Sequence, residues 1–581
     1  MKIHELYKDN EKIDLYSYLN KFHIQDIKEF LKPTGKYLDN CFDYYNMDKA
    51  CEMYIKHFTD DAYILCDSGD TDGITSAIIL YEYMSIDKET TIAPDTSNRN
   101  ISILIHQGKE RGLQDEELFE HIKNNPRPFL IIPDSGTNDY EQVKILKEEY
   151  NIDVLVLDHH DIINPIEHGI LVSNQSKKNK NISLYGSGCL VTHQFLRALD
   201  ICLAQTVSFW SVDMVALSLI SDSMNMSDLQ NRTYYHYGIE TLDCINNKFL
   251  KQLFIKFIGE NVYYTQRDIA FKIVPKLNSI CRSKNQDLKY LLITAFLEKN
   301  IDDALEMCGK AHQEQIALVD KIINDNIDKI NKASNNKLVL FSCDDMPRSY
   351  SGLIAGKIMN LSGGKPTIVG KIINGELIGS LRSPIALRGD LDNNNLVEWA
   401  KGHEQSCGVL IKENNLQPLI DYYNSLNLSY EPCIEVLKSY KIKDIPDDLF
   451  SLFGDDINAL WGYGIPKPIF EIHDIVFNSK DIQILGQNRR TLKITVDNIN
   501  ILFFNVSNQD KIDLGLGYIN ENKEFVYYDD NDNKFKLSII GSPSINRYIS
   551  PYGKVYINNQ IIVDNYSISK YIPKTKENVF K

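Results

Sequence analysis

The chain has 581 residues, which is too long for one hydrophobic core, so we expect about two to four domains. Its hydrophobic content of 43% and charged content of 24% are those of an ordinary globular protein. A formal net charge of −16 argues against a generally basic nucleic-acid binder. The 11 cysteines include no C-x-x-C pair, which argues against a zinc ribbon or a disulfide framework and indicates a reducing, cytoplasmic location.

The apolar segments predict no membrane partner. The N-terminus, residues 1–5, lacks the apolar core of a signal peptide. The most apolar long window, residues 207–220, is interrupted by Asp213 and is too short to cross a bilayer.

The first chemical signal along the chain follows a polar, helical segment at residues 1–59. Residues 61–66 predict a short strand, 67–73 an acidic, glycine-containing turn, and 74–83 a helix. This order is typical of the first βα unit of a parallel sheet. Residues 129–136 repeat the arrangement, with Asp134 just after an apolar run.

The third example is residues 154–161, where four aliphatic residues run into Asp158, His159 and His160. Such a run indicates a strand that is buried on both faces of a parallel sheet. Ligands of open α/β sheets bind at the carboxyl ends of the strands. The alternative is a set of helix caps beside a core histidine, since turn acids often cap helices.

Three such strand ends favour a divalent-metal site over three separate caps. Asp70 and Asp72 lie two residues apart and can each face one metal of a pair, and Asp134 could bridge them. Asp222 ends a further apolar segment. Oxygen ligands with imidazole suit Mn²⁺ or Mg²⁺, and a site without thiolates argues against structural zinc.

Three other features are weaker candidates for nucleic-acid binding. Gly186 lies in a glycine turn that enters a predicted helix, where backbone N–H groups could meet a phosphate. Arg232 follows the segment that ends in Asp222. The basic run at residues 177–180 is more typical of a solvated loop.

Composition divides the chain into five parts. In chain order they are an N-terminal helical segment (1–59), an α/β domain with a parallel sheet (60–235), a helical connector (236–332), a smaller α/β domain (333–428) and a C-terminal all-β region (429–581). Short strands alternate with polar turns from residue 472 to residue 557, which predicts a small barrel or sandwich.

The motifs resemble those of the DHH phosphoesterase superfamily, in the same order. The four that match are Asp70-x-Asp72-Gly73, Asp134-Ser135-Gly136, Asp158-His159-His160 and Asp222. Two further segments, Gly379-Ser380-x-Arg382-Ser383 and Gly402-His403 with Gly408, resemble the DHHA1 domain. Residues 461–470 and 546–548 resemble the entry to, and the closing segment of, the OB-fold of bacterial RecJ single-strand exonucleases. The similarity covers residues 61–564, and the richness in Asn, Ile, Lys and Tyr suits a phage or prophage version.

Three positions depart from the family pattern. Ser68 stands where many members have His or Asp, Cys66 where the RecJ branch often has His, and Lys401 where Gly-Gly-His begins. Asp67 could compensate for Ser68. These changes bear on metal occupancy more than on the fold.

The resemblance implies a site for two divalent ions, Mn²⁺ or Mg²⁺. Asp70 and Asp134 would bind one ion; the ligands of the other would be Asp72, Asp134, His159 and Asp222. Two ions about 3.5–4 Å apart can activate a water and stabilise the charge at phosphorus. His160 would bind the scissile phosphate, and Asp158 would orient a histidine. The residues that would grip the strand are Arg382, Ser383, Gly402 and His403, whereas Arg489, Arg490 and Lys493 fit a phosphate contact and a solvated surface equally well.

The resemblance also implies the function: hydrolysis of single-stranded DNA from the 5′ end to mononucleotides. We expect a monomer, with a single-strand-binding protein or a helicase as candidate partner. One alternative is a phosphodiesterase of short oligonucleotides or cyclic dinucleotides, against which the additional β-domain argues. The other is a replication or recombination scaffold with a weakened site, which Ser68 makes conceivable.

Overall fold

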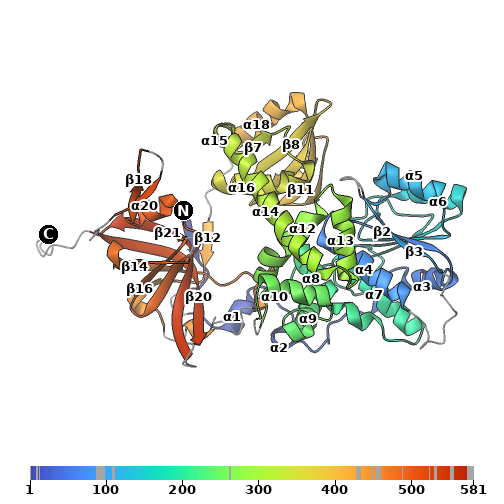
Figure 1. Ribbon diagram of the computed structural model, residues 1–581, viewed down its shortest axis with the longest axis horizontal. Coiled ribbons are helices and arrows are strands. Elements are labelled where there is room, and N and C mark those ends of the chain that lie inside the picture. Colours follow the sequence, from blue (N-terminus) through green and yellow to red (C-terminus); the bar gives the residue numbers. More distant parts are fainter. Residues whose placement is uncertain are drawn as a thin grey trace, which may run out of the picture. The chain divides into compact units, whose positions relative to one another are not determined.

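The computed structural model describes residues 2–7, 11, 13–86, 99–106, 111–260, 263–426, 433–446, 449–452, 459–486, 489–521, 524–528, 533–549 and 555–571. The chain divides into two compact units. The larger unit is Lys28–Tyr430, and the smaller unit combines Met1–Ile27 with Glu431–Lys581. Figure 1 shows the elements of both units in the colours of the sequence.

A five-stranded parallel sheet in the order β3-β2-β4-β5-β6 begins the larger unit. Its strands are β2 (Ala62–Cys66), β3 (Ile101–Ile105), β4 (Phe129–Pro133), β5 (Asp153–Asp158) and β6 (Ile170–Ser173). All residues of β2, β4 and β5 are buried, as their unbroken apolar sequences predict. The order is that of a doubly wound sheet, in which the direction of winding reverses between β2 and β4.

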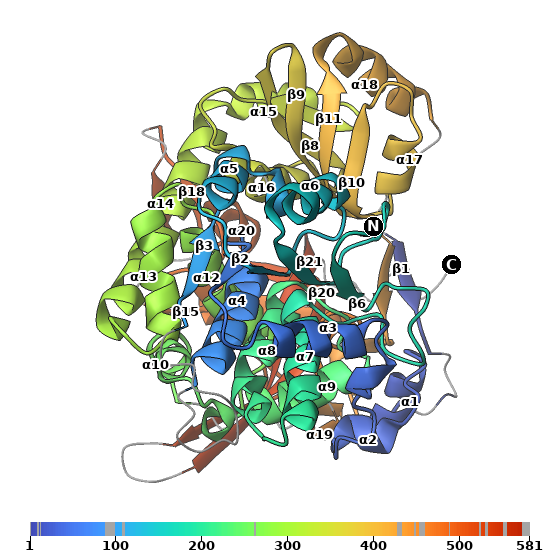
Figure 2. The same cartoon turned by 90° about the vertical axis from the view of Figure 1, so that its right-hand side faces the viewer.

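Helices cover both faces of this sheet. On one face lie α3 (Met47–Lys56), α4 (Thr71–Ser85) and α7 (Gly188–Cys202), which contact the sheet or one another; on the other lie α5 (Glu116–Asn124) and α6 (Tyr140–Tyr150) (Figure 2). Alternate side chains of the strands form one core with α5 and α6, which includes Leu130, Ile132, Val154, Val156, Ile122 and Leu146. Helices α8 (Val212–Ser221) and α9 (Leu229–Gly238) pack together beside α4 and α7.

The predicted helical connector is confirmed. It comprises α10 (Lys248–Phe257), α11 (Gln266–Asp268), the π-helical turn η5 (Ile269–Ile273), α12 (Val274–Cys281), α13 (Gln286–Phe296), α14 (Ile301–Asp325) and α15 (Ile327–Ala333). Asn278 of α12 accepts hydrogen bonds from the amide and hydroxyl of Thr71, at 3.1 and 2.8 Å, so the connector reaches the start of α4.

A second sheet in the order β10-β11-β9-β8-β7 forms the smaller α/β domain of this unit. Its strands are β7 (Val339–Ser342), β8 (Thr367–Ile373), β9 (Glu376–Arg382), β10 (Trp399–His403) and β11 (Ser406–Lys412). Only β7 and β8 run parallel; the other pairs are antiparallel. Its helices are α16 (Ser351–Leu361), α17 (Arg388–Asp392) and α18 (Leu416–Ser425).

The smaller unit is mostly β-structure, as predicted for residues 429–581. Its seven-stranded sheet has the order β13-β14-β20-β21-β17-β16-β15. These strands are β13 (Ser439–Lys441), β14 (Phe470–Asn478), β15 (Gln483–Leu485), β16 (Thr491–Val496), β17 (Ile499–Phe503), β20 (Lys534–Ile549) and β21 (Val555–Lys570). The other elements are α19 (Leu449–Leu452), α20 (Asn508–Asp513), β18 (Gly517–Ile519) and β19 (Phe525–Tyr527).

The N-terminal segment is not the single helical part that the sequence suggested. Strand β1 (Lys2–Glu5) pairs in parallel with β12 (Cys433–Val436), and α1 (Leu15–Asn20) also belongs to the smaller unit. Helix α3 instead packs on α7 of the larger unit. A four-residue strand carries too little pattern to be recognised without its distant partner. Among the described residues, no helix is both long and apolar enough to cross a membrane.

Candidate active site

The predicted acids and histidines meet at the carboxyl edge of the parallel sheet. Asp72 lies in the first turn of α4, Asp134 directly follows β4, and His159 directly follows β5. Asp222 comes from elsewhere, as the residue that ends α8. His159 Nε2 lies 3.3 Å from Asp134 Oδ1, 3.5 Å from Asp222 Oδ2 and 3.8 Å from Asp72 Oδ2. The cluster therefore lies at the switch point between β2 and β4, where doubly wound sheets bind ligands.

Two glycines allow the acids to approach one another. A Cβ at Gly73 would overlap the backbone carbonyl of Asp67, and a Cβ at Gly188 would overlap the side chain of Asp134. Asp134 itself has a left-handed backbone with φ of 61°, a conformation that costs energy for a non-glycine residue and is found at functional sites. Close packing against Asp67 and Asp134 thus explains why Gly73 and Gly188 carry no side chain.

The amino end of α7 binds Asp72. The backbone N–H groups of Gly188 and Cys189 donate to its carboxylate at 2.8 and 2.9 Å. Gly186, in the turn before the helix, is buried, and its carbonyl accepts from Asn174 at 3.0 Å. The predicted phosphate contact at Gly186 is therefore wrong, because a carboxylate of the protein already takes the place of the anion.

The charge of this cluster is poorly compensated within the protein. Burial raises the pKa of Asp72 to about 6. His159 lowers this pKa, but the negative charges of Asp222 and Asp70 raise it again and offset part of that effect. Burial, and then the charges of Asp72 and Asp70, raise the pKa of Asp134 well above its usual value. Asp134 Oδ1 is buried and accepts no hydrogen bond from the described residues. An unsatisfied oxygen in a buried acidic cluster is a feature that a bound cation would explain.

The donor set fits a divalent cation. Asp72, His159 and Asp222 offer ligand atoms within 4.8 Å of one another, and so does a second group of Asp134, Asp158, His159 and His160. Carboxylate oxygens with one imidazole suit Mn²⁺ or Mg²⁺. A cation here would satisfy the free oxygen of Asp134 and reduce the repulsion among the three acids.

Asp158 is equally buried, but all its capacity is used within the protein. It accepts from the amide and hydroxyl of Thr137 at 3.1 and 2.6 Å, from the amide of His159 at 2.7 Å, and pairs with His160 Nδ1 at 2.7 Å. Burial raises the pKa of Asp158, but the charge and hydrogen bond of His160 hold this pKa below its usual value. In turn Asp158 raises the pKa of His160 to about 9, so this half-exposed ring is held as a cation.

Asp70 is paired with a cation that the sequence did not indicate. Arg111 places Nη2 3.0 Å from Asp70 Oδ2 and Nη1 2.7 Å from Asp67 Oδ2. Burial raises the pKa of Asp70, but Arg111 and the hydrogen bond from Gly73 lower it overall. Both Asp67 and Asp70 thus contact Arg111, and neither belongs to the two groups of potential metal ligands among the described residues.

Ser68 and Cys66, the two departures from the family pattern, are both buried. Ser68 accepts a hydrogen bond at 3.1 Å from Lys289, a buried lysine of α13. The Cys66 thiol donates to the carbonyl of Gly73 at 3.5 Å. Burial, and then the charge of Asp67, raise the pKa of Cys66 well above its usual value, so it remains a thiol. A lysine side chain therefore contacts Ser68, the position at which many family members have an additional ligand.

The second α/β domain brings further cations toward the site. Arg382, at the end of β9, hydrogen-bonds only to the Leu381 carbonyl among the described residues and has no ion pair there. Burial, and then the charge of Arg282, lower its pKa. Arg282 follows α12 and acts in turn on Asp70. Neither Arg111 nor Arg282 lies in a recognisable sequence pattern, and only the fold brings them to the acids.

The other predicted residues of this domain differ in their exposure. Gly402, with φ of 124°, and His403 are exposed on the β10–β11 hairpin. Burial, and then the charges of His159 and His160, lower the pKa of His403, so this residue lies within electrostatic reach of the histidine pair. Ser383 is only 5% exposed, and its hydroxyl donates to the Ile385 carbonyl at 2.7 Å. The predicted contact of Ser383 with nucleic acid is therefore wrong.

Arg232 is also placed differently from its prediction. It is only 2% exposed and donates to the Phe30 carbonyl and to Glu240, both at 3.1 Å. A side chain that is buried and paired in this way cannot contact a strand. Arg232 stabilises the packing of α9, and the predicted nucleic-acid contact is wrong.

Comparisons with known proteins agree with this geometry. Residues 61–218 match the DHH family, N-terminal domain. The putative SPbeta prophage-derived single-strand DNA-specific exonuclease YorK of Bacillus subtilis (strain 168) is 25% identical over 521 residues, which cover 83% of this chain and 86% of YorK.

Two solved structures share the fold. RecJ of Thermus thermophilus in complex with Mn²⁺ has a TM-score of 0.71 at 16% identity, covering 97% of this chain and 79% of that chain. The same protein in complex with Mg²⁺ has a TM-score of 0.64, covering 97% and 78%. Residues 61–218 therefore form a domain of the DHH family, in a chain that has the RecJ fold.

Proposed function

We propose that this protein is a single-strand DNA exonuclease of the RecJ type, which uses Mn²⁺ or Mg²⁺ to hydrolyse phosphodiester bonds. The observation that carries the proposal is the cluster of Asp72, Asp134, His159 and Asp222, in which the first two acids are buried and the negative charge has few partners among the described residues. The similarity to YorK and the fold shared with RecJ support the same activity.

The ligands of one ion would be Asp72, Asp134, His159 and Asp222, and Asp70 with Asp134 would hold a second. When bound, such ions supply Lewis-acid charge and a nucleophilic water at neutral pH. For Asp70 this assignment requires Arg111 to share or release the carboxylate that it contacts at 3.0 Å.

The protein's own side chains would bind and orient the phosphate. His160 is charged near neutral pH, half-exposed, and fixed through Nδ1 by Asp158. Its Nε2–H has no hydrogen-bond partner among the described residues and can donate to a phosphate oxygen. Arg382 lies beside Arg282 without a carboxylate partner among the described residues. Arg382 lies within electrostatic reach of Arg282, and a guanidinium can bind a phosphate with two hydrogen bonds. The acidic edge and the cations beside it would thus hold the reacting phosphate between them.

Several finer features of the proposal rest on the family resemblance. They are the 5′-to-3′ direction, release of 5′-mononucleotides, preference for DNA over RNA, a monomeric state, a cytoplasmic location, and cooperation with a single-strand-binding protein or a helicase. The smaller unit, with its seven-stranded sheet, favours a long strand over a dinucleotide as substrate, because a dinucleotide needs no extended surface.

The test uses a long single-stranded DNA labelled at either end, with Mn²⁺, and a labelled dinucleotide in parallel. We expect mononucleotides from the 5′ label and none with Asp134→Ala. The matched control is Asp161→Asn, an exposed acid next to the histidine pair, which should cleave like the wild type. Cleavage of the dinucleotide alone would favour the short-substrate alternative, and binding of the long strand without cleavage would favour the scaffold.

A further inference from the structure

An exposed aromatic pair lies at the opposite end of α4 from the acidic cluster. Phe209 and Trp210 are 66% and 65% exposed, and their rings pack edge to face with centroids 5.9 Å apart. They lie on η3 (Ser208–Ser211). Asp200 fixes the start of this turn by accepting from the amides of Val207 and Ser208 at 3.0 and 2.8 Å. Two large aromatic side chains are thus exposed on a turn whose start is fixed by hydrogen bonds, and exposed apolar surface of this kind is a feature of sites that bind another molecule.

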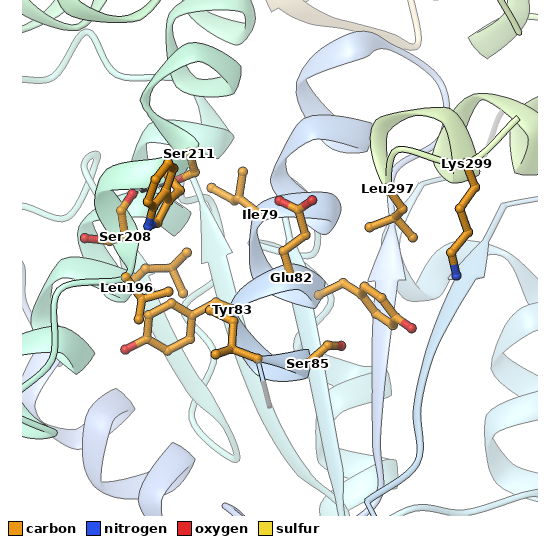
Figure 3. A pocket seen from close by; sticks show the side chains of 13 residues that line it. Ile79, Glu82, Tyr83, Ser85, Leu196, Ser208, Ser211, Leu297 and Lys299 are labelled. Atoms are coloured by element: carbon orange, nitrogen blue, oxygen red, sulfur yellow. Dashed lines mark hydrogen bonds between the residues drawn. The ribbon is translucent and has the colours of Figure 1, made fainter. Parts of the chain in front are cut away.

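A cavity of 510 Å³ opens beside Trp210. Its walls come from the last turns of α4, from Leu196 of α7, from η3 and from the segment after α13 (Figure 3). Tyr81, Tyr83 and Trp210 contribute aromatic surface to this wall. Glu82 lies ten residues after Asp72 on the same helix, so about 15 Å separates the cavity from the acidic cluster along the axis. This cavity is a separate feature from the candidate active site.

The carboxylate of Glu82 points into the cavity, as Figure 3 shows. It has no hydrogen bond or ion pair with the described residues. Burial, and then the charges of Asp213 and Glu298, raise its pKa to about 7. Lys299 lines the same cavity but lies away from Glu82 in Figure 3. Lys248 pairs with Glu298 at 2.5 Å and so does not neutralise Glu82.

We propose that this surface, which consists of Glu82, Tyr81, Phe209 and Trp210, binds a lysine or arginine side chain of a partner protein. The cation would pair with Glu82, its aliphatic stem would lie along the aromatic walls, and Phe209 and Trp210 would contact apolar neighbours of the basic residue. A cation is attracted to the face of a tryptophan ring, and tryptophan, tyrosine and arginine are enriched at the centres of interfaces. Nucleic acid is a poor occupant, because the nearby acids repel phosphates.

The test measures binding of two short peptides to the full chain by tryptophan fluorescence. The first is acetyl-Leu-Lys-Leu-amide, and the second carries acetyl-lysine in the middle, which removes only the charge. The chain has 3 tryptophans, so Trp210→Phe assigns the signal to this surface. We expect a saturable change with the lysine peptide and at least tenfold weaker binding of the acetylated one.

Two variants distinguish an effect of Glu82 itself from an effect of the protein's overall negative charge. Glu82→Gln should abolish the difference between the two peptides and leave nuclease activity unchanged. Glu314→Gln, an exposed acid on α14 outside the cavity, should preserve the difference. Equal binding of both peptides to the wild type, or an unchanged difference in Glu82→Gln, would overturn the proposal. Spermidine binding as tightly as the lysine peptide would overturn the assignment to a protein partner.

Discussion

Two aspartates at the carboxyl ends of β4 and β5 are equally buried but differ in their hydrogen bonds, their neighbouring charges and their pKa. Asp134 is 2% exposed and Asp158 is 1% exposed. Asp158 accepts four hydrogen bonds of 3.1 Å or less from Thr137, His159 and His160, and its pKa is lowered. Asp134 keeps an oxygen without a hydrogen bond from the described residues, stands among other acids, and has a strongly raised pKa.

This difference separates two roles that the sequence motifs place side by side. A buried carboxylate whose bonds are all made within the protein orients its neighbours, whereas one that lacks partners is ready to bind a cation. Burial alone does not distinguish them. The partners do, and they lead us to assign metal binding to Asp134 and the orientation of His160 to Asp158.

The largest expected effect comes from Asp134→Asn. The substitution keeps the shape but removes the charge that the ion would bind, so we expect activity to fall by at least about 10⁴-fold, or about 5.5 kcal/mol of transition-state stabilisation. Single-turnover cleavage of labelled single-stranded DNA measures this loss. A loss of less than tenfold at saturating Mn²⁺ would show that Asp134 is not a ligand.

Arg232→Met extends the comparison to a buried cation. Arg232 pairs with Glu240, which also pairs with His236, so removing the guanidinium leaves this buried carboxylate with one charged partner fewer and should cost up to about 3–5 kcal/mol of unfolding free energy. Urea unfolding of the larger unit measures this cost. The double variant Arg232→Met with Glu240→Leu should recover most of the stability. If a fully folded Arg232→Met protein bound DNA more weakly, this result would instead support the contact of Arg232 with nucleic acid that the sequence predicted.

Asp158→Asn should act on activity but not on the ion. His160 would lose the anion that holds its ring and its charge, and loss of such an orienting partner typically costs about 10- to 100-fold. The pH–rate profile provides the specific readout, since the variant should lose activity at a lower pH as His160 deprotonates. An unchanged profile would contradict the role assigned to Asp158.

The smallest effect is on the pH dependence of stability without metal. The folded-state pKa of Asp72, about 6, lies above the unfolded value near 3.8, so the native state binds more protons between these values. Stability should therefore fall by about 1–3 kcal/mol as pH rises from about 4 to 6. Thermal unfolding in EDTA should show this decline, and Asp72→Asn should reduce it. Stability that rises across this window would contradict the uncompensated charge.

The sequence predicted the edge of the sheet well, and for a physical reason. The buried strands β2, β4 and β5 are unbroken apolar runs, and the acids that follow them are adjacent in the chain, so local pattern and parallel pairing were sufficient. The glycines that follow these acids in the motifs were recognised from the same local pattern. Strand β6, with four residues, and β1, with a distant partner, had no comparable signal.

The charged partners could not be predicted in this way. Arg111 and Lys289 reach the site from a turn and from α13, and their contacts with Asp70 and Ser68 join parts that are remote in the chain. The same backbone N–H groups at the start of α7 suit a phosphate or a carboxylate, and the sequence does not say that Asp72 takes them. Arg232 was misassigned because a basic residue in a sequence shows neither its burial nor its partner.

The measurement that tests the central claim most directly is Mn²⁺ binding by calorimetry at pH 7, without DNA, for the wild type, Asp134→Asn and Asp158→Asn. We predict that the wild type and Asp158→Asn bind with affinities within about tenfold of each other, and that Asp134→Asn binds at least about 100-fold more weakly. Wild-type affinity in Asp134→Asn, or loss of binding in Asp158→Asn alone, would contradict the roles that their partners assign to these two aspartates.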